Sequence, residues 1–388
     1  MPPARAAELQ DIVDDVSGLL GAPTTLEDTA FALIAYSSQG GVAVDPVRAA
    51  SILGKTATAE VRAWFEKHGI ATASGPVHVP ADPEQGVAAR SCLPARSDGI
   101  THGYLWVLEP ATGFDPARLA RAESLVRRAG ELLALRRRGV DEHQRLVQDL
   151  LSGDETAAST ARAALVARGE LVAERPIAVV VVRVPAGIPA GVSAGSVPGG
   201  SVPGGSVLGG SVLVSEFVTS VDDPADPADP LGLAGRRASR LVGALGRAGI
   251  GTPRYRVQEL AAARHEADCA ARVALARPQL GPVLGWAELG FYRLAGQGPA
   301  AIEALVAGTP AARLRSRADT ELVRTALVYL DQAGHAARTA AALSVHRQTL
   351  YYRLEKIEQI CGIDLDQGEP RLQLHLGLAL TEILPFLR

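Results

Sequence analysis

Residues 344–361, near the C-terminus, combine hydrogen-bonding, cationic and aromatic side chains at the spacing of a helix. Leu350, Leu354, Ile357 and Cys361 follow one another at i, i+4, i+7 and i+11, which predicts one buried stripe. The opposite side of such a helix suits DNA, because glutamine pairs with an adenine edge, arginine with guanine, and lysine with phosphate. The pattern therefore predicts a helix that lies between a protein core and DNA.

The candidate DNA-contacting residues lie on this helix or on the short segment before it. Arg347 and Gln348 are expected to reach base edges, and Arg353 and Lys356 to reach phosphates. The full candidate set is Arg338, Thr339, Ser344, His346, Arg347, Gln348, Thr349, Tyr351, Tyr352, Arg353 and Lys356.

Two further helices must hold that helix in place. The first is predicted from Glu321 to Gln332, with Gly334 after it as the residue that stops a helix. The second is short and begins with His335 in its N-cap region.

Small residues and a tight turn connect the second helix to the third. Thr339, Ala340 and Leu343 lie near one face, and Ala340 is small enough for close helix packing. Ser344 is expected to cap the third helix, from Val345 to Ile360, by accepting from exposed backbone N–H groups. The same spacing also fits an ordinary helical hairpin, so a protein-binding adaptor is an alternative to DNA binding.

The charge of the chain restricts where DNA could bind. The net charge is −3 and the pI is near 6.3, which excludes a general coat for nucleic acid. Between Gly334 and Cys361 there are four Arg or Lys and two Glu, which gives 4 − 2 = +2. Because this local charge is small, we expect a homodimer or higher homo-oligomer that grips double-stranded DNA at two half-sites.

Catalytic motifs are weak or missing from the sequence. Gly191–Gly195 matches GxSxG, but the Val-Pro-Gly-Gly repeats after Ser193 cannot continue as the helix that a nucleophile elbow needs. The sequence has no phosphate-binding GxxxxGK[ST] loop, no HExxH and no zinc-ligand spacing. We expect no enzyme, cofactor or metal, and keep a hydrolase at Ser193 or a nucleotide cyclase in the middle region as enzymatic alternatives.

Four regions follow from the hydrophobic patterns, and the fold class expected is α+β multidomain. Residues 1–112 mix helix and strand signals, and residues 113–170 read as linker helices, interrupted at Arg136–Gly139, that could dimerise or pack on their own domain. Residues 171–300 alternate strands and helices around a Gly/Pro-rich insertion at 186–210. Residues 315–388 are expected to be all helical.

The middle region contains the clearest buried strand of the sequence. Val, Ile and Ala dominate residues 176–184, and further strands are predicted at 212–221, 255–260 and 282–289. Helices are predicted at 236–247 and 261–276.

The chain is expected to be cytoplasmic. Its first residues, MPPARAAELQDIVDD, place acids where a signal peptide needs an apolar core, and no run of about 18 apolar residues occurs. We expect no membrane contact.

The segment SVHRQTLYYRLEKIEQICGIDL, followed by GEPRLQLHLGLAL, resembles the C-terminal helix-turn-helix of PucR-type transcription regulators, which include purine-catabolism and sugar-diacid regulators. His335 and Gln348 depart from the family, which usually has asparagine at the first position and often at the second. The matching core is Val345, His346, Arg347, Thr349, Leu350, Tyr352, Arg353, Leu354, Ile357 and Glu358.

The rest of the chain resembles this family more loosely. The middle region is similar to a degenerate GGDEF-like domain without its motif, and the first region to a GAF-like or PAS-like sensor. The resemblance implies a ligand-responsive regulator of metabolic genes, with a small-molecule effector whose identity the sequence does not give.

Overall fold

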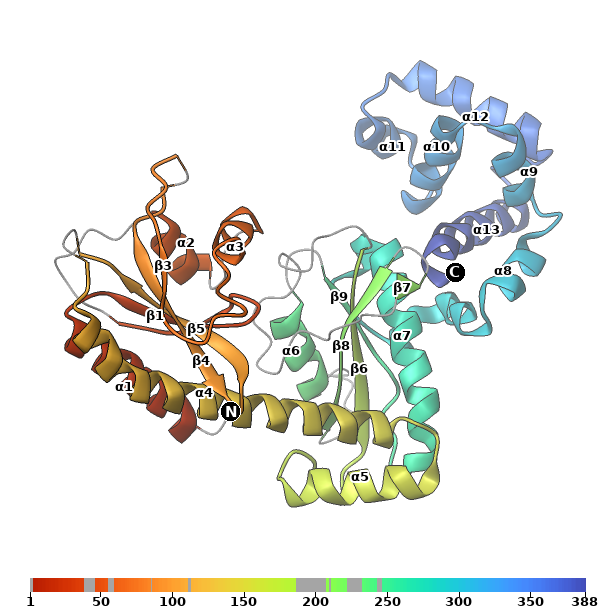
Figure 1. The fold of residues 1–388 in the computed structure, drawn as a ribbon. Coiled ribbons are helices and arrows are strands. Elements are labelled where there is room, and N and C mark those ends of the chain that lie inside the picture. The colour runs from red at the N-terminus through yellow and green to blue at the C-terminus, as the bar shows by residue number, and fades with distance from the viewer. Residues whose placement is uncertain are drawn as a thin grey trace. The chain divides into compact units, whose positions relative to one another are not determined.

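The computed structural model describes residues 3–37, 46–54, 59–84, 86–110, 113–185, 207–208, 211–221, 232–242 and 246–388. Of these, the residues up to Gln148 form one compact unit, and those from Asp149 onward form a second (Figure 1). Each unit contains one five-stranded sheet, and the second ends in a group of helices. The chain is thus a mixed α/β multidomain protein with a helical C-terminal region.

The first unit is built on an antiparallel sheet in the order β2-β1-β5-β4-β3. Strand β1 gives no strand signal in the sequence, because its residues Thr24, Thr25 and Glu27 are polar although they are buried. The strands are β1 (Thr24–Asp28), β2 (Leu33–Tyr36), β3 (Val77–Val79), β4 (Arg90–Ser97) and β5 (Ile100–Leu108).

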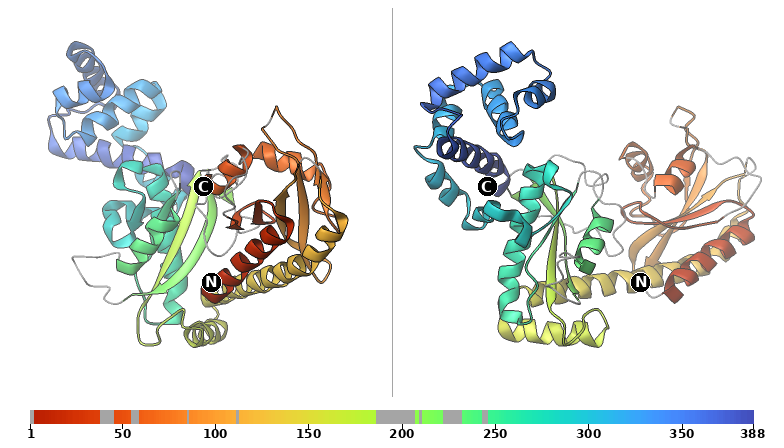
Figure 2. Two further views of the ribbon diagram at one scale, coloured as in Figure 1. Left: turned by 90° about the vertical axis from the view of Figure 1, so that its left-hand side faces the viewer. Right: turned by 180° about the vertical axis from the view of Figure 1, so that it is seen from behind.

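Helices cover both faces of this sheet. Leu105 and Val107 point to a core shared with α1 (Pro3–Leu20) and α4 (Pro116–Leu150), which lie side by side in Figures 1 and 2. Tyr104 and Trp106 alternate with Leu105 and Val107 along β5, so they point to the opposite face of the sheet. There they join an aromatic cluster beneath α2 (Pro46–Gly54) and α3 (Ala59–Glu66).

Helix α4 corrects the prediction of two helices interrupted at Arg136–Gly139. It is one helix of 35 residues. A single glycine in a helix costs only about 1 kcal/mol relative to alanine and arginine is a good helix former, so the segment does not break. The helix begins at Pro116, where the Asp115 carboxylate accepts from the Ala117 N–H at 2.9 Å.

The second unit contains a sheet in the order β10-β9-β6-β8-β7, in which only β10 and β9 are parallel. Residues Ile177–Val182 of β6 are all buried, which confirms the predicted interior strand. The strands are β6 (Ile177–Pro185), β7 (Val207–Leu208), β8 (Ser211–Ser220), β9 (Arg247–Ile250) and β10 (Val283–Gly285).

Helices α5 (Glu155–Ala167), α6 (Gly232–Leu241) and α7 (Leu260–Ala276) belong to this part of the unit. Val180 and Val182 pack with α6, so their neighbour Val181 and its cross-strand partner Gly249 face the other way, toward α7. A Cβ at Gly249 would collide with the backbone of α7, so only glycine allows this helix to lie so close to the sheet.

Several predicted boundaries in this region were wrong. The helix predicted at 236–247 ends at Leu241, and Arg247 already begins β9. The strand predicted at 255–260 is a 3-10 turn, η1 (Val257–Glu259), that leads into α7, and the strand predicted at 282–289 is reduced to β10. Short apolar runs do not distinguish strand from helix when tertiary contacts decide. Apart from β7, the insertion at 186–210, with Ser193, lies outside the described residues.

The helical region packs around one core with α7. It begins with the 3-10 segments η2 (Pro278–Leu280) and η3 (Trp286–Gln297). The helices are α8 (Pro299–Val306), α9 (Pro310–Arg317), α10 (Thr320–Asp331), α11 (Ala336–Leu343), α12 (Arg347–Cys361) and α13 (Gly368–Leu387). Within the described part of the chain, no helix has the length and apolar character needed to cross a membrane.

Candidate nucleic-acid interface

Helix α10 is closed at both ends by residues suited to those positions. The Asp319 carboxylate caps it by accepting from the Leu322 N–H at 2.8 Å. After its C-terminus the chain turns through Ala333 and Gly334, which have φ angles of 54° and 80°. The guanidinium of Arg371 from α13 lies where a Cβ on Gly334 would be, but this flexible end can move, so the left-handed backbone is what favours glycine there.

The turn between α11 and α12 corrects the predicted role of Ser344. Ser344 has a φ of 54° and is the C-cap of α11, not the N-cap of the next helix. The N-cap of α12 is His346, whose ring Nδ1 accepts from the Gln348 N–H at 3.3 Å. The sequence suggested serine because serine is the commoner cap, whereas the left-handed backbone places histidine at that position.

The inner side of α12 is the one that the apolar spacing predicts. Leu350, Leu354, Ile357 and Cys361 are all buried in the helical core. At the C-terminal end of α12, the guanidinium of Arg313 donates to the carbonyl of Cys361 at 2.9 Å. The helix is therefore fixed along its inner side and at its end.

The outer side of α12 exposes most of the candidate residues. Tyr352 is 66% exposed, and the guanidinium of Arg347 donates to the Tyr351 hydroxyl at 2.8 Å while lying 5.3 Å from that ring. This pairing orients Arg347 at the first turn of α12 without removing its charge from solvent. The exposed candidates are Arg338, Ser344, His346, Arg347, Gln348, Thr349, Tyr351, Tyr352 and Lys356.

Two candidates have other roles. Thr339 is fully buried, and its hydroxyl donates to the His335 carbonyl at 2.9 Å, so it packs α11 and cannot meet DNA. The side chain of Arg353 is only 15% exposed, and its guanidinium is paired with the Glu321 carboxylate of α10 at 2.6 Å. Arg353 therefore joins two helices, which leaves little of its side chain exposed, and its contact with phosphate stays a prediction.

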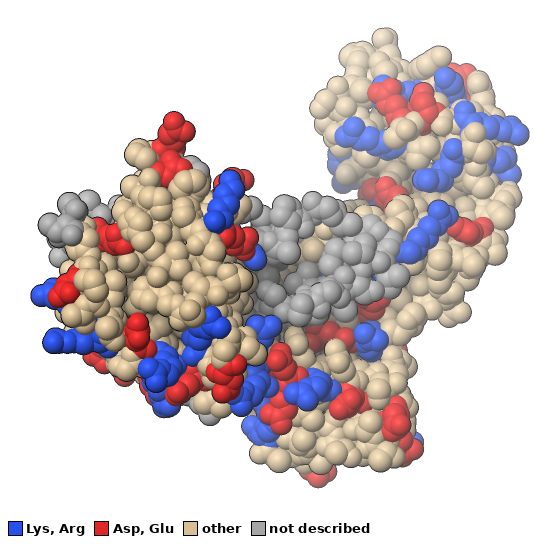
Figure 3. Space-filling model, in the orientation of Figure 1, with Lys and Arg blue, Asp and Glu red and all other residues tan. Residues whose placement is uncertain are grey.

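Arg315, Arg317 and Arg324 are exposed arginines just before and within the start of α10 that the sequence did not single out. They precede or begin the segment that carries the family resemblance, and helical spacing alone does not say which of them share a side with α12. Figure 3 shows Lys and Arg side chains spread over the surface of this region, with fewer Asp and Glu among them.

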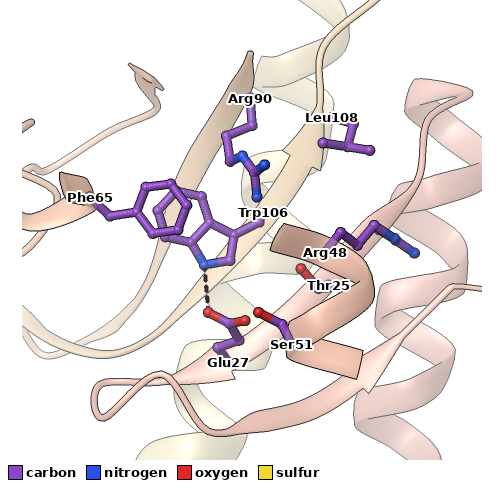
Figure 4. Close-up of a pocket in the computed structure, with 8 residues that line it drawn as sticks. All are labelled: Thr25, Glu27, Arg48, Ser51, Phe65, Arg90, Trp106 and Leu108. Atoms are coloured by element: carbon purple, nitrogen blue, oxygen red, sulfur yellow. Dashed lines mark hydrogen bonds between the residues drawn. The ribbon is translucent and has the colours of Figure 1, made fainter. Parts of the chain in front are cut away.

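The first unit contains a polar pocket, drawn in Figure 4. Glu27 accepts from the Trp106 Nε1–H at 3.0 Å, and Arg90 lies 5.2 Å from the ring of Phe65. The cavity has a volume of about 10 Å³, which is room for one water molecule. Its lining is Thr25, Glu27, Arg48, Ser51, Phe65, Arg90, Trp106 and Leu108. Among the described residues, no group of His, Cys, Asp or Glu could hold a metal ion.

Comparison with known proteins identifies the helical segment. Residues 322–380 match the PucR C-terminal helix-turn-helix domain. The chain is 36% identical over 70 residues to the purine catabolism regulatory protein of Bacillus subtilis, which is 18% of this chain and 13% of that protein. It is also 36% identical over 74 residues to the carbohydrate diacid regulator of Escherichia coli, which is 19% of each.

These matches therefore span less than a fifth of each regulator's length. Both relatives are named as regulators and not as enzymes. A solved structure, a regulator of polyketide synthase expression from Bifidobacterium adolescentis, aligns with 61% of this chain and 90% of its own at 16% identity. Its TM-score of 0.24 is too low to support an argument about the arrangement of domains.

The predicted resemblance is confirmed for this segment. Helices α10, α11 and α12 and the start of α13, within residues 322–380, form a PucR C-terminal helix-turn-helix domain.

Proposed function

We propose that this chain is a transcription regulator that inserts α12 into the major groove of double-stranded DNA. The observation that supports this most is the two-sided construction of α12, with a buried leucine stripe behind an exposed side that begins with Arg347 and Gln348. An α-helix fits the major groove, where base edges offer donors and acceptors to these two side chains.

The first turn of α12 is the part that reads bases. Gln348 offers the amide that can pair bidentately with adenine, and Arg347, oriented by Tyr351, offers the guanidinium that pairs with guanine. Arg338 of α11 and Lys356 of α12 are exposed cations that suit phosphates. The pairing of Arg353 with Glu321 and the burial of Thr339 hold α10, α11 and α12 at the angle that insertion of α12 into the groove needs.

The chain functions as a ligand-responsive homodimer in this proposal. The first unit is a GAF-like or PAS-like sensor, and the α/β part of the second is a degenerate GGDEF-like domain that connects it to the DNA-binding helices. The small charge of the motif supports two half-sites, since each contact alone is weak. The effector must occupy a larger space than the cavity at Glu27 has in this structure.

Genome-wide footprinting with the purified full-length chain tests the function. We expect discrete protected sites, each with two half-sites separated by about one helical turn of DNA or a multiple of it. Gln348→Ala should weaken the selective protection, by about 1–3 kcal/mol of affinity for the sites. Gln359→Ala is the matched control, because Gln359 is also exposed on α12 but lies at its C-terminal turn, and it should leave the sites unchanged.

The alternatives predict different results. The protein-binding adaptor would be favoured if no DNA site is protected and if the chain binds a protein partner with an affinity that does not depend on salt. Turnover of a nucleoside triphosphate or an ester would favour an enzyme.

A further inference from the structure

Helix α9 lies just before the segment that matches the helix-turn-helix domain, and it is rich in arginine. It carries Arg313, Arg315 and Arg317, while Ala311 and Leu314 bury its inner side. Residues 313–324 contain four arginines, one Asp and one Glu, which gives 4 − 2 = +2. This equals the charge of the motif itself.

Two contacts fix how α9 runs along α12. Near its start, Arg313 donates to the Cys361 carbonyl, and the Cys361 thiol donates to the Pro310 carbonyl at 3.6 Å. Beyond its end, Glu321 of α10 pairs with Arg353 of α12. From Arg313 to Glu321 the residue numbers rise, while the residues they contact on α12 fall from Cys361 to Arg353. Helix α9 therefore runs antiparallel to the C-terminal half of α12.

This direction places Arg317 beside α12. Arg317 is four residues after Arg313, so both lie on the same flank of α9, the flank that contacts α12. Arg315 is two residues from each, roughly 200° around the helix, and points to the other side. Lys356 lies on the part of α12 between the two contacts.

Arg324 of α10 completes the group. It is three residues after Glu321 and is therefore a neighbour of the Glu321–Arg353 pair on the helix surface. Arg317, Arg324 and Lys356, here called the basic strip, are exposed, and among the described residues none of them is in an ion pair. Of the carboxylates near the strip in sequence, Glu321 is paired with Arg353, Asp319 caps α10, and Glu355, next to Lys356, is exposed.

We propose that the basic strip binds the sugar–phosphate backbone of DNA beside the groove that α12 enters, so that Arg317, outside the matched segment, is a DNA contact. This rests on the proposed function. A helix in the major groove brings the helices packed on its flank toward the phosphates that border the groove, and arginine pairs with a phosphate through two N–H groups. Arg317 and Arg324 add two positive charges to those of the motif, and the strip reads no sequence.

The test compares single glutamine variants of the full-length chain on a protected site and on a scrambled duplex. Each phosphate contact contributes about 0.9 to the slope of log affinity against log salt. Arg317→Gln and Arg324→Gln should each reduce that slope by about 0.9 and lower affinity several-fold for both duplexes, with the selectivity unchanged. Arg315→Gln is the matched control, since it removes the same charge from the opposite flank, and it should leave the slope unchanged.

Each outcome of this comparison supports or overturns the proposed contact between the basic strip and DNA. A wild-type slope in the Arg317 and Arg324 variants would overturn the proposal while leaving the proposed function intact, provided that Gln348→Ala still lowers selectivity. An equal loss of slope in Arg315→Gln would overturn the proposal too, because it would show that total charge, and not the position of the basic strip, sets the salt dependence. A wild-type chain that does not bind DNA would remove both proposals. Circular dichroism of each variant checks that the substitution of the exposed residue leaves the fold intact.

Discussion

Glu27 is a carboxyl whose buried environment changes its acidity. It lies on β1, 3% exposed, and its carboxylate accepts from Trp106 in a pocket that Arg90 also lines. Burial raises the pKa of this carboxyl to about 7, although the hydrogen bond from Trp106 and the charge of Arg90 oppose the shift. A carboxyl of this kind resists ionisation near neutral pH.

The shift predicts a stability that falls as pH rises. Below the unfolded pKa of 4.5 both states are protonated and nothing is lost, whereas between 4.5 and about 7 only the unfolded state releases its proton. Glu27→Gln removes this cost, so the free energy of unfolding at pH 8 should rise by on the order of 2–3 kcal/mol. Urea unfolding followed by tryptophan fluorescence from pH 5 to 8 measures it, since Trp64 and Trp106 report on this unit.

The control for this comparison is Glu84→Gln, which removes a carboxylate that is exposed. It should follow the wild-type pH profile. A Glu27→Gln protein with the same pH profile as Glu84→Gln would show that Glu27 titrates normally in the folded state.

At the scale of elements, the sequence predicted what depends on periodicity. The leucine stripe of α12 needs only a 3.6-residue repeat to be recognised, and it is buried as expected. The polar strand β1 was missed because the residues that bury Glu27 and Thr24 are supplied by other parts of the chain. Ser344 was assigned to the wrong helix because its left-handed conformation is set by packing between α11 and α12.

The pairing of α10 with α12 carries an element-scale prediction. Arg353→Ala should lower the free energy of unfolding of the helical region by about 1 kcal/mol, because it removes a partly buried ion pair with Glu321. The salt dependence of DNA binding by the folded protein should change little, since the guanidinium of Arg353 is mostly buried and paired with Glu321. Urea unfolding and salt titration of affinity measure the two quantities.

A double-mutant cycle with Glu321→Ala separates the pair from its parts. If the two substitutions add without coupling, the ion pair contributes nothing. If Arg353→Ala flattens the salt dependence, Arg353 contacts phosphate after all.

At the scale of the whole second unit, the α/β part and the helices are joined by ionic contacts. Arg277, at the end of α7, has a side chain 5% exposed and pairs with Asp331 of α10 at 3.0 Å and with Glu382 of α13. Burial would raise the pKa of Asp331, but the hydrogen bonds from His375 and Arg277 lower it overall. Arg272 of α7 also donates to the Phe386 carbonyl at 2.6 Å.

Breaking this network should uncouple the helices from the α/β part. Arg277→Ala leaves two carboxylates without their shared cation, and both are about a third exposed, so the free energy of unfolding should fall by about 1–3 kcal/mol. Arg256→Ala, an exposed arginine next to η1, is the control. Equal urea midpoints for the two variants would contradict a role for the network.

Such long-range contacts explain what sequence reasoning could not reach. Arg277 and Glu382 are 105 residues apart, and no local pattern announces that they meet. The helix-turn-helix was recognisable from its own residues, whereas its shared core with α7 depends on the whole fold.

In the proposed complex, α12 reads bases through the residues of its first turn. The most direct test of this claim is the affinity of the full-length chain for a protected site and for a scrambled duplex, measured at one stated salt concentration. Arg347→Ala and Gln348→Ala should each lose about 1–3 kcal/mol on the site and little on the scrambled duplex. Variants that keep the wild-type preference for the site would contradict the claim.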